Sequence, residues 1–209
     1  MKERIKMKNY LMLNNKKIEL TPEQVKEIEN SFEFNKTQLK NIPVGETFKV
    51  NNLEFIVLEH KEETTCVILK GFYKTTSFDD SSNDYRESLI RNILNSEFYK
   101  LLSNAVGNEN IVNHTVDLTS DDGRTDYQSC DDNISLLTCD MYRKYVYILE
   151  KYNPQKWWWL ATAHSTESNG YERAVRCVYV NGTLYNYFCY FNNGVRPFCI
   201  LKSNIFVSK

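Results

Sequence analysis

The chain has 209 residues, of which 42% are hydrophobic and 13% aromatic, and its formal net charge at pH 7 is −1. This length suits one domain with an appendage, or at most two small domains, and the near-neutral charge creates no overall field that would attract nucleic acid or an anionic membrane. Its 7 glycines and 4 prolines are too few for a disordered chain, and no apolar run approaches the roughly 20 residues of a membrane span. Residues 1–8 are basic but precede no apolar segment, so we expect no secretory signal and a cytoplasmic protein.

Residues 1–35 form the predicted appendage, a small hairpin followed by an amphipathic helix. Residues 10–13 and 17–20 have strand character and flank two asparagines. Thr21 and Gln24 form a capping box that predicts a helix start. Three apolar residues at helical spacing form one stripe on it: Val25, Ile28 and Phe32. The stripe either packs on the protein's own core or serves as an interaction element, such as a homo-oligomer contact through this N-terminal segment.

The main domain is predicted over residues 44–209, after a linker at 36–43. Segments 46–51, 53–58 and 65–69 alternate or are continuously apolar and indicate an antiparallel meander. A helical period then extends through Leu102, with a start near Asp84 to Glu87 and a break at Asn95-Ser96.

The following segments mix strands, a polar loop and a helix. We expect a short strand at 111–118, an acidic loop at 119–133, and a strand-like entry at 134–137. Thr138 should cap a helix that continues to about Tyr152. Together with the C-terminal strands below, these elements predict an α+β class, mainly antiparallel sheet with two or three helices.

All three tryptophans of the chain stand in a row, Trp157-Trp158-Trp159. Successive strand side chains point to opposite faces, so Trp157 and Trp159 should share one face and Trp158 the other. A strand that buries large aromatic side chains on both faces must be central and covered on both sides. We therefore assign the three tryptophans a structural role.

The C-terminal segment predicts a hairpin, residues 174–180 and 183–191, around the Asn181-Gly182 turn. A two-residue turn there would pair Cys177 with Asn186 and set Cys177 and Cys189 on opposite faces, where they cannot form a disulfide. We expect all six cysteines to be reduced. Residues 192–194 are predicted as a turn, and residues 198–201 as the terminal strand.

Two candidate sites have alternative interpretations. The loop with Asp121, Asp122 and Asp126 is either a solvated acidic loop or a calcium ligand set, although the EF-hand spacing is absent and we expect no bound metal. Arg196, between glycine and proline, is either a buried structural arginine bonded to carbonyls, which we favour, or a ligand contact. No nucleophile, base and orienting group can be assembled from spacing, so neither an enzyme nor a cofactor is expected.

Aromatic, basic and amide residues gather between the tryptophans and the C-terminus. They describe either an amphipathic sheet with cation–π contacts or a recognition surface, for which protein is a better partner than nucleic acid at this net charge. The predicted binding residues are Tyr171, Arg173, Arg176, Tyr179, Tyr185, Tyr187, Tyr190 and Asn192.

Several short motifs resemble a known family. They are residues 95–99 (NSEFY), 134–138 (ISLLT), 158–162 (WWLAT), 181–182 (NG) and 194–197 (GVRP). Their order is similar to that in a domain of unknown function from low-GC Gram-positive bacteria and their phages, over about residues 44–201. The Trp-Trp-Leu and Gly-Val-Arg-Pro pair also resembles the C-type-lectin-like fold of formylglycine-generating enzymes. That fold is what the resemblance implies for residues 44–209.

The resemblance has departures and implies no reaction. Ala161-Thr162 replaces the family's usual Arg-Ser, and the paired catalytic cysteines of formylglycine-generating enzymes have no counterpart in the matched motifs. It implies a phage or prophage setting in the host cytoplasm, without a membrane partner. The function we expect is a binding protein for a host protein, such as a component of a bacterial defence system that an anti-CRISPR or similar inhibitor would block. The alternative is a small-ligand, nucleotide or glycan module, with calcium as an optional requirement.

Overall fold

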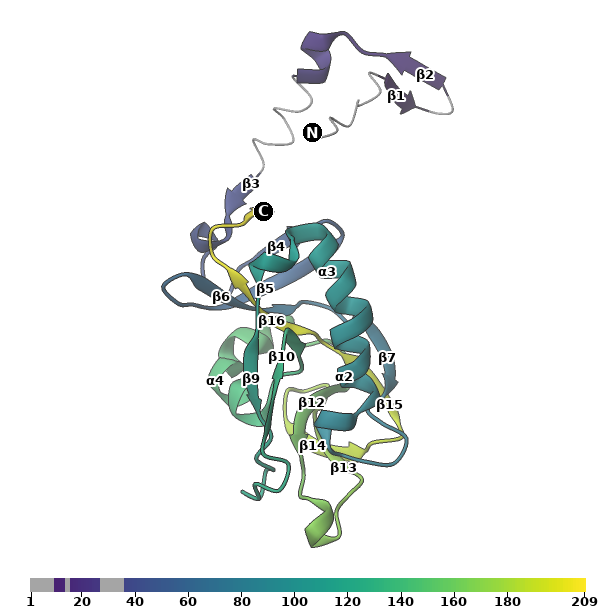
Figure 1. Ribbon diagram of the computed structural model, residues 1–209, viewed down its shortest axis with the longest axis vertical. Helices are drawn as coiled ribbons and strands as arrows, with labels where there is room; N and C mark the ends of the chain where they lie inside the picture. Colours follow the sequence, from purple (N-terminus) through teal and green to yellow (C-terminus); the bar gives the residue numbers. More distant parts are fainter. Residues whose placement is uncertain (1–9, 14–15, 27–35) are drawn as a thin grey trace.

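The computed structural model describes residues 10–13, 16–26 and 36–209, and Figure 1 shows the order of its elements. At the N-terminus β1 (Tyr10–Leu13) pairs antiparallel with β2 (Lys16–Glu19), as predicted. The capping box also forms, because Thr21 N donates to Gln24 Oε1 (3.0 Å) and Gln24 N donates to Thr21 Oγ1 (3.2 Å). Ile28 and Phe32, which complete the predicted stripe, lie outside the described residues.

The larger sheet has eight strands within the described residues, in the order β11-β16-β6-β5-β4-β17-β3, with β8 added beside β16. Their bounds are β3 (Lys36–Gln38), β4 (Thr47–Val50), β5 (Leu53–His60), β6 (Thr64–Leu69), β8 (Ile111–Val112), β11 (Ile134–Ser135), β16 (Phe198–Lys202) and β17 (Phe206–Ser208). The predicted meander is therefore confirmed as β4, β5 and β6. All pairings in this sheet are antiparallel.

Two predictions about the ends of the main domain were wrong. Residues 36–43 are not a linker, because β3 pairs with β17 and both Leu39 and Ile42 are buried. β16 is not the terminal strand, since β17 follows it after a tight turn. β3 and β17 carry no strong strand pattern of their own, and each gains its partner from the opposite end of the main domain.

The smaller sheet has five strands in the described part of the chain, in the order β14-β13-β12-β15-β7. Their bounds are β7 (Lys74–Ser77), β12 (Trp158–Ala163), β13 (Ala174–Val178), β14 (Leu184–Phe188) and β15 (Asn192–Val195). Residues 192–194 were predicted as a turn but form β15, which pairs parallel with β12 and antiparallel with β7.

The central position of the tryptophan strand is confirmed. β12 is the third of the five strands, and Trp158 and Trp159 are both 0% exposed. Trp159 and the partly buried Trp157 belong to one hydrophobic cluster, whereas Trp158 belongs to the other. The period of two in side-chain direction therefore holds along this segment.

The β13–β14 hairpin has a different register from the predicted one. Tyr179 N donates to Thr183 O and Gly182 N donates to Tyr179 O (both 2.9 Å), so three residues form the loop, and Gly182 takes a φ of +85°. This is a type I turn closed by a left-handed glycine, which moves the pairing by one residue. Cys177 faces Tyr185 rather than Asn186, and Cys177 and Cys189 lie in the same cluster.

All six cysteines, each within the described residues, are free thiols, as predicted. Burial raises the pKa of Cys177 to about 12 and also raises the pKa of Cys199. Thiols that are protonated and buried react slowly with oxidants, so these cysteines behave as small core side chains.

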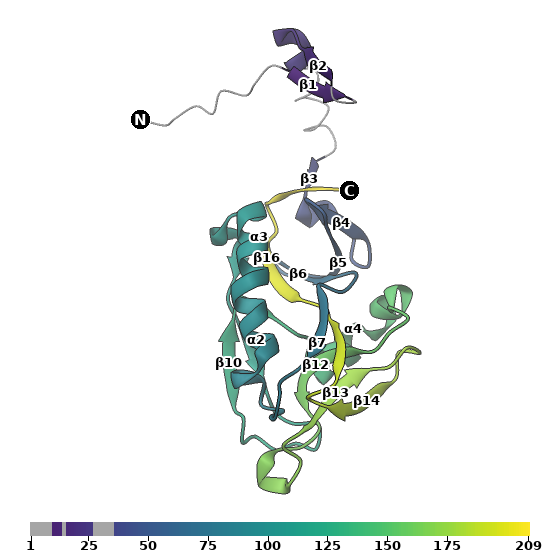
Figure 2. The same ribbon diagram turned by 90° about the vertical axis from the view of Figure 1, so that its right-hand side faces the viewer.

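The helices lie on opposite sides of the sheets, α2 (Leu89–Ile93) and α3 (Tyr99–Val106) on one side and α4 (Cys139–Leu149) on the other (Figure 2). One long helix consists of α2, a π turn (Leu94–Phe98) and α3, and α4 is capped by Thr138 Oγ1 as predicted. The first helix packs in the cluster of Trp159, and α4 packs in the cluster of Trp158. The remaining short 3-10 turns in the described residues are Leu39–Asn41, Tyr85–Glu87, Asn108–Asn110, Glu150–Tyr152 and Glu167–Asn169.

The predicted helix break at Asn95-Ser96 corresponds to the π turn. Asn95 Nδ2 donates to Ile134 O (2.9 Å), and Asn95 Oδ1 accepts from the backbone N–H groups of Asn133 and Ile134 (both 3.2 Å). One amide side chain thus satisfies the backbone where the chain enters β11. π turns often mark such inserted contacts.

The acidic segment 119–133 is only partly a loop. β9 (His114–Asp117) pairs antiparallel with β10 (Ser129–Asp132), so the last residues of the segment form one strand of a two-stranded ribbon.

None of the helices in the described part of the chain has the length and apolarity that crossing a bilayer requires.

His114 makes the stability depend on pH. Its Nε2 lies 2.9 Å from Ser135 Oγ, its ring packs edge-on against Phe198 at 5.2 Å between centroids, and burial lowers its pKa. Below pH ~6.5 the unfolded chain then binds more protons than the folded one, so the free energy of unfolding falls as the pH falls. His114→Gln should reduce the stability loss between pH 7 and pH 5 by up to about 2 kcal/mol in urea unfolding. An unchanged loss in this variant would contradict the assignment.

Candidate recognition site

A cavity opens where β12 and β15 begin. The two strands are parallel and joined by Gly194 N, which donates to Trp157 O at 2.9 Å. Parallel strands begin at the same edge of a sheet, so the segments that enter β12 and β15 converge there. The cavity measures about 360 Å³, and we call it the Trp157 cavity. Its lining residues are Phe72, Thr75, Gln155, Lys156, Trp157, Val180, Tyr187, Asn192, Asn193 and Gly194.

Aromatic side chains form one wall of this cavity. The ring of Trp157 lies 4.6 Å from that of Tyr179, 5.4 Å from Tyr185 and 5.0 Å from Tyr187, measured between centroids. The interplanar angles for Tyr179 and Tyr185 are 88° and 78°, the edge-to-face arrangement that aromatic pairs favour. Trp157 is thus held in place by the β13–β14 hairpin.

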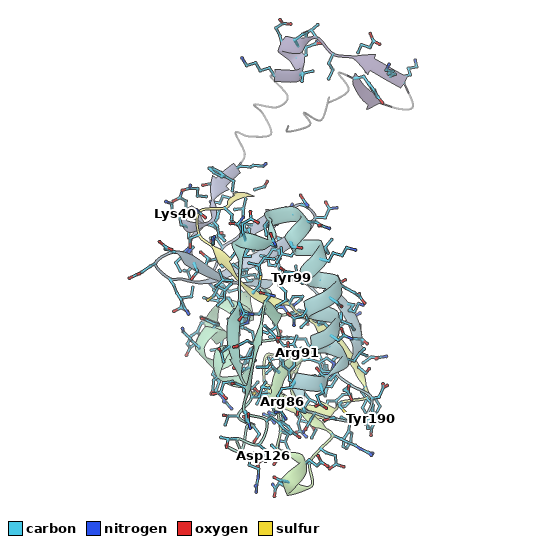
Figure 3. All side chains as sticks on the ribbon, viewed as in Figure 1. Lys40, Arg86, Arg91, Tyr99, Asp126 and Tyr190 are labelled. Carbon is cyan, nitrogen blue, oxygen red and sulfur yellow. The ribbon has the colours of Figure 1, made fainter. Side chains whose placement is uncertain are left out.

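A second group of aromatic residues continues from this wall to the surface. Phe188 stacks on Tyr190 at 5.5 Å, Tyr190 contacts Phe191 at 4.8 Å, and Phe191 contacts Tyr187 at 4.6 Å. Tyr190 projects at the edge of the molecule beside β14 and β15 (Figure 3). We use the term aromatic face for the exposed members of this group, Phe188 (50% exposed), Tyr190 (45%) and Phe191 (41%), together with the exposed Tyr185 (53%) of the first group.

The polar lining of the cavity is amide-rich. Asn193 is 6% exposed, and its Nδ2 has no hydrogen-bond partner among the described residues. A buried donor without a partner costs about 1–3 kcal/mol. Lys156 contributes an ammonium group, and Gln155 and Asn192 contribute exposed amides.

Gly194 lets Phe72 pack against the strand at the base of the cavity. A Cβ at this position would overlap the ring of Phe72. The glycine therefore fixes how closely this ring approaches the sheet, which is a common reason for glycine inside a strand.

The predicted binding residues are only partly brought together. Tyr179, Tyr185 and Tyr187 surround Trp157, Tyr190 belongs to the aromatic face, and Asn192 lines the cavity. The other three predicted residues have separate surroundings. They are Tyr171, which packs on His164 at 5.4 Å, Arg173, which lies 3.9 Å from Glu172, and Arg176, whose Nε lies 3.5 Å from Asp121 Oδ2.

Strand alternation separates Arg176 from the other predicted binding residues on the hairpin. It is one residue from Val175 and Cys177, which face the cluster of Trp159, so it points toward the opposite face. Its side chain is 13% exposed and lies beside Asp121. It is therefore not part of the same surface as Tyr185 and Tyr187.

Arg196 lies beneath Trp158 and is 0% exposed. Its Nε and Nη2 donate to the carbonyl oxygens of Leu69 and Lys70 (both 3.2 Å), its guanidinium carbon lies 4.7 Å from the centroid of Trp158, and Nη1 is unpaired in the described structure. Burial lowers the pKa of Arg196 to about 9, because the charge is removed from water without a carboxylate beside it.

The aspartates of the acidic segment are engaged by side chains. Asp121 accepts from Arg143 Nη2 (2.7 Å), Asp122 accepts from Ser165 Oγ (2.7 Å), and Asp126 accepts from Ser168 Oγ (2.8 Å). Hydrogen bonds from hydroxyl groups lower the pKa of Asp122 and Asp126. Across residues 10–13, 16–26 and 36–209 no three His, Cys, Asp or Glu side chains are grouped as metal ligands would be.

The cavity-lining residues that sequence reasoning missed come from separate segments. Phe72 and Thr75 precede or belong to β7, Gln155 and Lys156 precede β12, and Asn193 lies in a segment predicted as a turn. The sequence showed that Tyr185 and Tyr187 share one face of a strand, but not that they pack around Trp157. The parallel contact of β12 with β15, which creates the cavity, has no local sequence signal.

The aromatic face and most of the cavity lie within the segment that comparison with known proteins identifies. Residues 141–203 match a family described as a domain of unknown function (DUF6273). This segment includes α4, β12 and the strands from β13 to β16, so it contains all four residues of the aromatic face. It is less than a third of the chain and shorter than the resemblance over residues 44–201, of which the motifs at 95–99 and 134–138 fall outside it. No curated protein and no solved structure matches the chain.

Proposed function

We propose that the chain is a non-enzymatic binding protein that recognises another protein through its aromatic face. The observation that carries the proposal is a group of exposed aromatic side chains in which the rings of Phe188, Tyr190 and Phe191 contact one another. Tyr185 joins them through Trp157 and Tyr187, and each of the four is 41–53% exposed. Contiguous exposed apolar surface of this kind marks interaction sites, whereas scattered exposed aromatics do not.

The place of these residues in the fold supports a protein partner. Tyr185 and Phe188 lie on β14, which is an edge strand of the five-stranded sheet, and Tyr190 and Phe191 follow within the next three residues. An edge strand presents unpaired backbone N–H and C=O groups to an incoming chain. Tyrosine and phenylalanine supply large contact areas at low entropic cost, and both are enriched at interfaces. The net charge of −1 gives no corresponding support for nucleic acid.

The setting belongs to the proposal as well. The resemblance implies a phage or prophage protein with a C-type-lectin-like arrangement that acts in the host cytoplasm. The partner would then be a host protein, for example a component of a defence system. The small-ligand alternative is favoured by one specific observation, the Trp157 cavity.

A capture experiment with matched variants tests the proposal. The purified chain is immobilised and exposed to lysate from low-GC Gram-positive bacteria, beside a triple variant with Tyr185→Ser, Phe188→Ser and Tyr190→Ser. The control variant is Tyr147→Ser, because Tyr147 is 82% exposed but lies on α4. A specific partner should be retained by the wild type and the control, and the triple variant should retain at least about tenfold less.

Two outcomes would contradict the proposal. One is retention of no protein at micromolar concentration, or equal retention by the triple variant. The other is self-association in sedimentation that the triple variant abolishes, since the aromatic face would then be a contact between copies of this chain. Melting curves of all variants establish that they are folded.

A further inference from the structure

We propose that the Trp157 cavity receives a carboxylate side chain of the partner polypeptide, so that the protein anchors an acidic residue next to its aromatic face. This inference rests on the proposed function and deepens it. Four facts carry it: the sign of the charge in the lining, the exposed amide donors of Gln155 and Asn192, the aromatic walls, and the continuity of the cavity with the aromatic face.

The charge of the lining selects an anionic group. Lys156 is its only charged residue, and Asp and Glu do not contribute to it. Lys156 forms no ion pair with a residue of the described structure and is exposed at the rim, where its ammonium group can reach an entering anion. Hydrogen bonds between ammonium and carboxylate are stronger than those between neutral groups.

The donors in the lining suit the same group. The side chains of Gln155, Asn192 and Asn193 each carry an NH2 group, and that of Asn193 is unpaired and buried. A carboxylate offers about four acceptor positions on two oxygens, so it can accept from an amide and an ammonium together. The Asn193 amide is itself closed to solvent, so the exposed amides of Gln155 and Asn192 are the donors that an entering carboxylate can reach.

The size and walls of the cavity suit an amino-acid side chain. A volume of about 360 Å³ lies at the small end of ligand pockets. The rings of Phe72, Trp157 and Tyr187 provide apolar walls for methylene groups, while the polar residues are at the rim and on β15. Such a division, apolar walls with few convergent polar groups, fixes the orientation of what is bound.

The cavity and the aromatic face form one surface. Tyr187 lines the cavity and its ring lies 4.6 Å from that of Phe191, a member of the aromatic face. A polypeptide bound along the edge strand therefore passes the mouth of the cavity. A buried anchor residue surrounded by aromatic contacts is the usual arrangement of an interface hot spot.

The test uses short peptides and the full chain, so it requires no identified partner. The probes are N-acetyl-Phe-Glu-amide and N-acetyl-Phe-Gln-amide, which differ only in charge, together with acetate as an isolated carboxylate. Binding is followed by ¹H–¹⁵N NMR through the indole N–H of Trp157 and the side-chain amide of Asn193. We expect the Glu peptide to shift both signals and to bind at least about tenfold more tightly than the Gln peptide, with acetate weaker than either.

Variants locate the binding and separate the two proposals. Lys156→Gln should reduce affinity for the Glu peptide at least about fivefold, and Asn192→Leu should also reduce it. Lys151→Gln, an exposed lysine after α4, is the control and should change nothing. Equal affinity for the Glu and Gln peptides, or affinity that survives Lys156→Gln, would overturn the carboxylate assignment. Partner capture through the aromatic face is a separate measurement. Capture without peptide binding would contradict only the carboxylate assignment, and peptide binding without capture would contradict only the proposed function.

Discussion

Arg196→Ala is expected to lower the free energy of unfolding by about 4 kcal/mol. The substitution leaves a void beneath Trp158, and it removes the donors of the carbonyl oxygens of Leu69 and Lys70. Both effects act in a region that is fully buried, where neither solvent nor a mobile side chain can compensate. Urea unfolding at pH 7 measures the change.

Arg196→Met separates volume from charge. Burial lowers the pKa of Arg196 to about 9, below the value of the unfolded chain, so the charged form is less favourable in the folded protein. This unfavourable contribution is fully present below pH 9 and is relieved as the pH rises through 9 toward the unfolded value. Methionine removes it and fills most of the space, so we expect a stability within about 1.5 kcal/mol of the wild type. If methionine lowered the free energy of unfolding as much as alanine, the contribution of Arg196 to stability would come mainly from its carbonyl hydrogen bonds and its cation–π contact.

The features that sequence reasoning predicted are those with strong local periodicity. The segments of β4, β5 and β6 alternate or are continuously apolar, β12 starts with large aromatic side chains on both faces, and the helix after Thr138 has both a cap and a helical period. In each case the residues that specify the element lie within it. The two faces of the tryptophan strand followed from the same local rule.

The features that were missed depend on contacts between distant segments. β15 begins with Asn192-Asn193, which are turn residues by composition, and it becomes a strand only because β12 and β7 flank it. β3 and β17 are three residues each and stabilise one another from opposite ends of the domain. The register of β13 with β14 depended on whether two or three residues form the turn, and Asn181-Gly182 is compatible with both.

The candidate site shows the same division. The aromatic residues of β14 were visible in the sequence as a group, whereas their contacts with Trp157 appear only in the structure. Asn193 and Lys156 have ordinary sequence surroundings, and they become cavity residues only through the parallel pairing of β12 with β15. Arg176 was wrongly grouped with the tyrosines because it is near them in sequence. Strand alternation places it on the opposite face, beside Asp121.

Asn83→Leu is expected to lower the free energy of unfolding by about 4 kcal/mol, the other large effect in the protein. Asn83 is 0% exposed, and its Nδ2 donates to the carbonyl oxygens of Ser165 (2.8 Å), Tyr171 (2.7 Å) and Ala174 (2.8 Å). Its Oδ1 accepts from Tyr127 Oη at 2.7 Å. Leucine fits the volume but removes the side-chain donor from three carbonyl oxygens and the acceptor from the Tyr127 hydroxyl group. Ala174 O retains its bond from His164 N, and Tyr127 Oη retains its bond from Glu167 N.

Asn83→Asp provides a sharper test, because it preserves the shape and changes only the chemistry. An ionised carboxylate would face three carbonyl oxygens, and the neutral form can donate to one of them, so the pKa of the new carboxyl group must rise in the folded state. Its native form then binds more protons than the unfolded chain above pH ~3.9, and stability falls as the pH rises. We expect Asn83→Asp to be closest to Asn83→Leu in stability near pH 4 and to fall below it by pH 7, while Asn92→Asp, at an exposed position on α2, stays near the wild type. A constant difference between the two Asn83 variants over this range would mean that the side chain can leave the buried network, and the segment from Ser165 to Ala174 would then be held by its backbone hydrogen bonds instead.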